Sequence, residues 1–77
     1  MTGVQWACLM VYARNMPDGP QRRAVGLLCV RNKPARFTTA MITAGGLGLI
    51  VRGKLTAEGD ALARTVLRRE GLGMVAP

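Results

Sequence analysis

The chain has 77 residues, 49% of them hydrophobic, and carries eleven Lys and Arg against four Asp and Glu, a formal net charge of +7. This length allows one domain around one small core, and the apolar content excludes a disordered tail. Trp6, Tyr12 and Phe37 are the only aromatic residues, which argues against an RNA-binding sheet that stacks bases on several rings.

The first thirty residues predict two apolar elements separated by a turn. Residues 4–13 (VQWACLMVYA) are almost continuously apolar, and their Met, Leu and Ala content favours a helix. Two prolines flank Asp-Gly in residues 15–20, which is typical of a turn. Residues 21–30 follow Pro20, a residue suited to the first turn of a helix. The alternative is a β-hairpin over residues 4–30, which would make the fold α+β.

A third helix is predicted to begin at Pro34, because proline disfavours helical geometry in the residue before it. We expect this helix to stop near Gly45 and Gly46, which are poor residues for a helix interior. Helical spacing places three apolar residues on its inner face: Phe37, Met41 and Ala44. Four others are expected on or beside the opposite face: Arg36, Thr39, Ala40 and Thr43.

The last third predicts a small hairpin and a final helix. Leu49-Ile50-Val51 and Lys54-Leu55-Thr56 flank Arg52-Gly53 as the strands of a small hairpin would, which indicates a tight β-turn. Thr56 suits the N-cap of the helix that follows, Asp60 is spaced to pair with Arg64, and Gly71 is expected to end it. The expected fold is therefore a mainly α single domain, residues 1–77, with a short β-hairpin.

The residue inventory argues against an enzyme or a zinc protein. The chain lacks histidine, so Cys8 and Cys29 cannot complete a four-ligand Cys/His zinc site. Both cysteines lie in apolar runs and are expected to be buried free thiols. Four acidic residues without histidine offer no convincing acid-base pair, so we expect no catalysis, no cofactor and no metal.

The apolar runs also bear on location and assembly. The longest, residues 40–51, is shorter than the roughly 18 residues needed to cross a bilayer. No export signal is recognisable at the start of the chain, so we expect a cytoplasmic protein with no membrane partner. A core this small leaves stabilisation by a second copy open, so a homodimer is one of the expected assemblies.

Residues 47–63 carry a family resemblance. Gly48-Leu49-Ile50, followed after a short gap by Leu55-Thr56-Ala57-Glu58-Gly59-Asp60-Ala61-Leu62, resembles the end of a winged helix-turn-helix DNA-binding domain, notably in regulators of the multiple-antibiotic-resistance type. The resemblance implies that residues 34–44 form the recognition helix and that Arg52-Gly53-Lys54 forms a reduced wing. The wing is shorter than is usual in the family, and residues 31–34 replace its compact turn.

The winged reading assigns candidate contacts along the chain. Four residues of the third helix would face the major groove: Arg36, Thr38, Thr39 and Thr43. Arg52 and Lys54 would reach phosphates or the minor groove from the wing. Three more cations complete the set of candidate nucleic-acid contacts: Arg22, Arg23 and Lys33. Arg22 and Arg23 are included because the helix dipole disfavours cations at a helix start.

The sequence therefore predicts a small basic protein that binds double-stranded DNA, acting as a transcriptional regulator or an accessory factor. The alternative is a non-enzymatic inhibitor or adaptor whose basic face binds an acidic protein surface, such as that of a nucleic-acid-processing complex.

Overall fold

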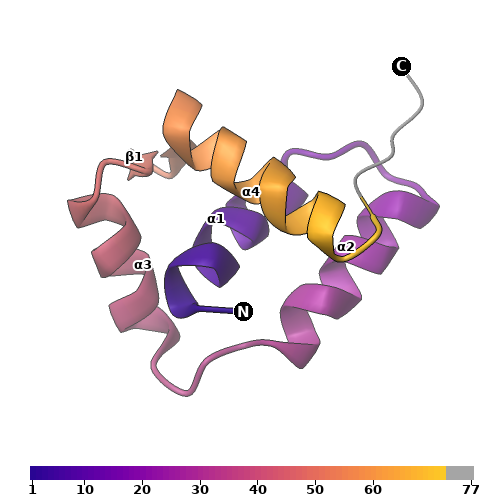
Figure 1. Ribbon diagram of the computed structural model, residues 1–77, viewed down its shortest axis with the longest axis horizontal. Helices are drawn as coiled ribbons and strands as arrows, with labels where there is room; N and C mark the ends of the chain where they lie inside the picture. Colours follow the sequence, from indigo (N-terminus) through magenta and orange to yellow (C-terminus); the bar gives the residue numbers. More distant parts are fainter. Residues whose placement is uncertain (73–77) are drawn as a thin grey trace.

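A computed structural model describes residues 1–72, which form four helices and one two-stranded antiparallel hairpin (Figure 1). The elements, in chain order, are α1 (Gly3–Arg14), α2 (Pro20–Arg31), α3 (Phe37–Gly46), β1 (Ile50–Val51), β2 (Lys54–Leu55) and α4 (Ala57–Arg69). The fold is mainly helical, as the sequence predicted. The alternative hairpin over residues 4–30 is wrong, because both apolar segments are helices.

Helix α1 lies at the centre of the domain and packs against each of the other three helices (Figure 1). Its apolar residues occur all round the helix, which is the pattern of an element buried on every side. Ala7, Leu9 and Val11 are fully buried. A capping box starts the helix: the Thr2 hydroxyl accepts from the Gln5 amide at 3.1 Å, and the Gln5 side chain accepts from the Thr2 amide at 2.9 Å.

Helices α2 and α3 flank α1 and make little direct contact with each other (Figure 1). The prediction that the third helix begins at Pro34 is wrong, since α3 begins at Phe37. The reason is the distance between the two helices: residues 32–36 must carry the chain from one side of α1 to the other, so Pro34 belongs to the connection.

The predicted inner face of α3 is also partly wrong. Ala40 is buried, whereas Phe37 is 45% exposed. The cause is the close approach of α3 to α1: a Cβ atom built on Gly3 would lie 3.2 Å from the Cβ of Ala40. Only small side chains fit such a contact, so Ala40 and Ala44 face α1.

Helix α3 ends at Gly46, which confirms the predicted stop near Gly45 and Gly46. Gly45 and Gly46 are its last two residues, and Gly48 takes the left-handed conformation, with φ of 76°. The amide of Leu49 then donates to the Ala44 carbonyl at 3.0 Å. This turn directs the chain into β1.

Both cysteines are buried free thiols, as expected. Burial raises the pKa of Cys8 and of Cys29 above the ordinary value for a thiol. Trp6 connects two helices nearby, since its indole Nε1 donates to the Cys29 carbonyl oxygen at 2.9 Å. That bond satisfies a backbone acceptor in the last turn of α2.

Candidate nucleic-acid interface

The β-hairpin presents two cations at its tip. Ile50 pairs with Leu55 and Val51 with Lys54, so Arg52 and Gly53 form a two-residue turn. Both turn residues have positive φ, 54° for Arg52 and 75° for Gly53, which is the pattern of a type I′ turn. Glycine adopts this conformation freely, but arginine is strained in it. The side chains of Arg52 and Lys54 are exposed.

Thr56 and Gly59 fix the hairpin to α4. The Thr56 hydroxyl donates to the Gly48 carbonyl at 2.7 Å and accepts from the Gly59 amide at 3.2 Å. A Cβ atom on Gly59 would lie 2.1 Å from the Leu49 carbonyl oxygen, so no larger residue fits. The Leu-Thr-x-x-Gly pattern of residues 55–59 therefore holds the hairpin in place.

The outer face of α3 is neutral and polar with one large apolar residue. Thr38, Thr39 and Thr43 are exposed, and Ile42 is 68% exposed between them. No charged residue occurs within α3. The helix thus offers hydroxyl and methyl groups, which can contact base edges and the thymine methyl in a major groove.

The connection before α3 carries the cations at the other end of this face. Lys33 and Arg36 are both exposed, and Arg36 is the residue that precedes the first turn of α3. The Lys33 ammonium lies 4.6 Å from the centre of the Phe37 ring, a cation–π contact that orients it.

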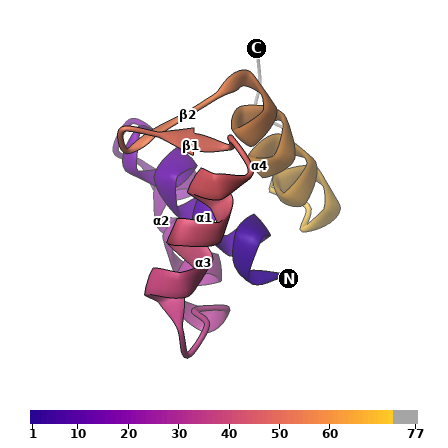
Figure 2. The same ribbon diagram turned by 90° about the vertical axis from the view of Figure 1, so that its left-hand side faces the viewer.

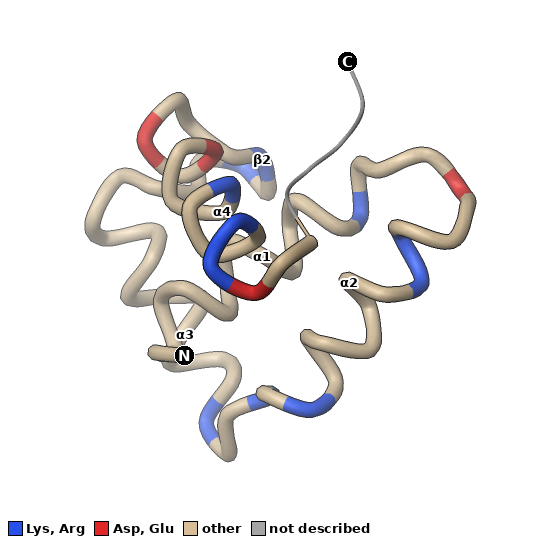
Figure 3. Tube along the Cα trace, turned by 45° about the vertical axis from the view of Figure 1, so that its right-hand side comes forward, with Lys and Arg blue, Asp and Glu red and all other residues tan. Residues whose placement is uncertain are grey.

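These elements form one face of the molecule (Figure 2). The hairpin lies beyond the end of α3, the connection lies beyond its start, and both carry basic residues (Figure 3). A helix with its side chains is about 10–12 Å across, which matches the roughly 12 Å width of the DNA major groove. The ten residues of α3, about 15 Å in length, separate the two basic ends of this face.

Arg22 and Arg23 lie away from the hairpin. They are in the first turn of α2, on the other side of α1 (Figure 1). The Arg22 guanidinium Nη1 is 2.6 Å from the Asp18 carboxylate Oδ1, an ion pair that gives Arg22 a structural partner. The other seven candidate residues lie on α3, on the connection before it or on the hairpin: Lys33, Arg36, Thr38, Thr39, Thr43, Arg52 and Lys54. Two of them also line hollows beside other elements, since Lys33 lines one with Trp6 and Lys54 lines one with Tyr12 and Asp60.

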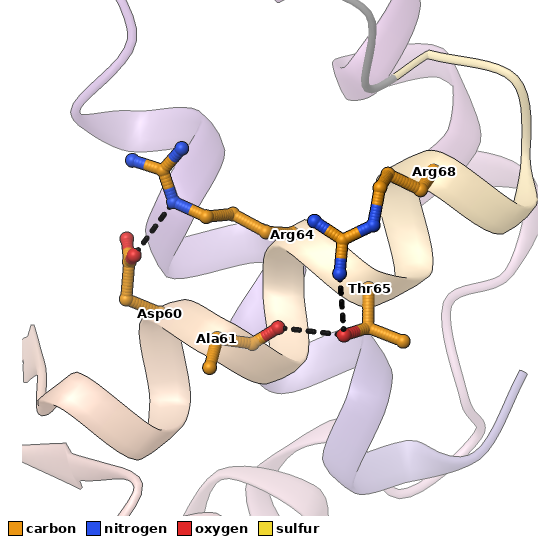
Figure 4. A network of polar contacts seen from close by, with 5 residues as sticks. All are labelled: Asp60, Ala61, Arg64, Thr65 and Arg68. Atoms are coloured by element: carbon orange, nitrogen blue, oxygen red, sulfur yellow. Dashed lines mark hydrogen bonds and ion pairs between the residues drawn. The ribbon is translucent and has the colours of Figure 1, made fainter.

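Two cations of α4, Arg64 and Arg68, are engaged within their own helix (Figure 4). The Arg64 Nε donates to Asp60 Oδ2 at 2.7 Å, which confirms the predicted pair, and Arg68 donates to the Thr65 hydroxyl at 3.2 Å. The hydrogen bond to Asp60 raises the pKa of Arg64 further, so its charge is constant at any working pH.

Sequence reasoning missed the apolar surface next to this face. Leu27 is 59% exposed and Val30 is 72% exposed in the apolar run over residues 24–30. The sequence contained a signal for this surface. Seven consecutive residues with almost no polar side chain point in every direction around the helix axis, and a helix that packs on one neighbour cannot bury them all.

Comparison with known proteins gives no relative: no family model, curated protein or solved structure matches this chain. Within residues 1–72 no three His, Cys, Asp or Glu side chains are grouped so as to hold a metal ion. None of the helices in this range has the length and apolar character to cross a membrane.

Proposed function

We propose that this protein binds double-stranded DNA in the manner of a reduced winged helix, with α3 in the major groove and the β1–β2 turn on the flanking backbone. The observation that carries the proposal is the arrangement of one face: a neutral helix with basic residues beyond both of its ends (Figures 2 and 3). The order of three helices, a hairpin and a fourth helix supports the same assignment.

The conformation of Arg52 adds independent support. A type I′ turn favours asparagine or glycine at this position, and arginine there costs stability. An arginine retained at a strained, exposed tip has no packing role, which favours a contact outside the chain. Phosphate is the partner that matches a guanidinium best. The biological use we propose is regulation of transcription, or an accessory role in it.

The proposed contacts set the expected salt dependence. Four cations lie around the α3 face: Lys33, Arg36, Arg52 and Lys54. If each neutralises one phosphate, the affinity falls about 150-fold between 50 and 200 mM salt. Fluorescence anisotropy of a labelled random duplex measures this directly. Binding should be micromolar or tighter at low salt, and no binding there would refute the proposal.

Two double variants separate a defined interface from general basic charge. Arg52→Gln with Lys54→Gln removes two cations from the hairpin, and Arg68→Gln with Arg69→Gln removes two from the exposed end of α4. The hairpin variant should lower the salt slope by about 1.8, because two phosphate contacts are lost, while the α4 variant leaves the slope near its original value. Equal losses in both would contradict the assigned face.

A further inference from the structure

An open apolar groove runs between α2 and α3, with α1 as its floor, and has a volume of about 490 Å³. Trp6 and Met10 of α1 form part of the floor, Gly26 and Val30 line the α2 side, and Phe37 and Met41 line the α3 side. The groove exists because α2 and α3 are both packed on α1 and are separated from each other.

Gly26 keeps the α2 wall of the groove low. It lies in the middle of α2, where glycine costs about 1 kcal/mol relative to alanine. Neither a positive φ nor a close neighbour requires glycine there, since a Cβ atom would meet nothing within 4 Å. Glycine at this position is therefore not required by backbone conformation or by packing within the chain, and it leaves the groove open beside it.

The apolar surface continues past the groove along α2. Val30 lies on the rim, and Leu27 is three residues earlier on the neighbouring part of the helix surface. Both are largely exposed. The α2 residues that line this side run from Arg22 to Val30, which is about 12 Å of helix. A surface of this length fits two turns of a helix better than a compact small molecule.

The rim of the groove is basic. Arg14, Arg22 and Lys33 line it, and the acidic residue near them, Asp18, is already paired with Arg22. The apolar floor excludes a DNA backbone as the occupant, and the net charge of +7 makes a second copy of this chain repel. An occupant that matches must combine apolar side chains with carboxylates.

We infer that the α2–α3 groove is a docking site for an acidic amphipathic helix of another protein. Its apolar side chains, spaced at three and four residues, enter the groove over Trp6, and its carboxylates meet Arg14 and Lys33 on the rim. The site shares Lys33 with the face proposed for DNA, but its apolar floor on α1 and its α2 side lie outside that face. The protein would then join a DNA site to an acidic protein partner.

The probe is a synthetic helical peptide of about 16 residues, with leucine on one face and glutamate on the other, and a second peptide with lysine in place of glutamate. Trp6, the single tryptophan, lines the groove and reports binding through its emission. The acidic peptide should bind with a micromolar Kd and shift that emission, and the basic peptide should not bind.

Gly26→Leu should fill the groove without changing charge, and weaken the acidic peptide at least about tenfold. Gly26→Ala is the matched control and should keep its affinity for the acidic peptide within about threefold, while circular dichroism checks that both variants fold.

Equal binding of the two peptides, or of Gly26→Leu and the original protein, would overturn the inference. So would a dimer in sedimentation equilibrium that Gly26→Leu abolishes, because a second copy would then be the occupant. DNA anisotropy on Gly26→Leu should be unchanged, so a failure of this site is distinguishable from a failure of DNA binding.

Discussion

Arg52→Asn should stabilise the protein and weaken DNA binding at the same time. Arg52 has a φ of 54°, a left-handed conformation that costs a side chain with a Cβ roughly 1–2 kcal/mol, whereas asparagine tolerates it. Asn-Gly is also the preferred pair for a type I′ turn. We expect a gain of about 0.5–1 kcal/mol, and hence a rise in Tm of roughly 2–8 °C for a domain of this size.

The same substitution removes a cation from the proposed interface. The slope of log affinity against log salt should fall by about 0.9, because one phosphate contact is lost. Differential scanning calorimetry measures the first effect and fluorescence anisotropy the second.

Lys54→Gln is the control for this experiment. It removes the same charge from the neighbouring strand residue, which has no left-handed backbone, so it should weaken DNA binding without raising Tm. A Tm for Arg52→Asn at or below that of the original protein would refute the strain argument. An equal rise for Lys54→Gln would mean that reduced charge repulsion, and not turn geometry, causes the gain.

Three further variants test the packing of the fold. Gly59→Ala should destabilise the protein by at least about 2 kcal/mol, because the new Cβ would meet the Leu49 carbonyl. Helix propensity alone predicts the opposite, a gain in stability. Stabilisation of the variant in a urea titration would show that the contact relaxes. Burial raises the pKa of Cys8 and Cys29 in the folded protein. As the pH rises, the thiols of the unfolded chain, with an ordinary pKa of about 8.5, therefore lose their protons first. The contribution of the two thiols to stability is present below that pH and falls above it. Replacing both with alanine should flatten the dependence of unfolding free energy on pH above about 8.5, and an unchanged slope would implicate other groups. Trp6→Phe should lower the free energy of unfolding by about 1–3 kcal/mol, because it leaves the Cys29 carbonyl without its hydrogen bond. Unfolding followed by circular dichroism measures this change. A decrease below about 0.5 kcal/mol would show that water replaces the indole.

The elements that the sequence predicts well are those governed by neighbours in the chain. Thr56 accepts from the amide three residues on, and Asp60 pairs with Arg64 one turn later, so both are local. The Arg52-Gly53 turn is similar, since two adjacent residues suffice to reverse a chain.

The parts that the sequence did not predict depend on contacts between distant segments. Ala40 is buried because Gly3 allows α1 to come close, and helical periodicity within α3 cannot show that. The start of α3 at Phe37 likewise depends on how far α2 and α3 are separated. The candidate site could be predicted in part from the sequence. Its hairpin follows from the local sequence pattern, but the groove between α2 and α3 arises only when three helices are assembled.

The central position of α1 has a consequence for synthesis of the chain. Helix α1 is apolar on every side, and α4, which covers it, is made after α2, α3 and the hairpin. The Arg69 guanidinium donates to Gln5 at 3.2 Å, a contact between residues 64 positions apart. Until α4 has been made, α1 therefore has no full cover and exposes surface that can aggregate. A ribosome stalled before α4 would carry a nascent chain that needs a chaperone, whereas synthesis of α4 supplies the segment that completes the cover of α1.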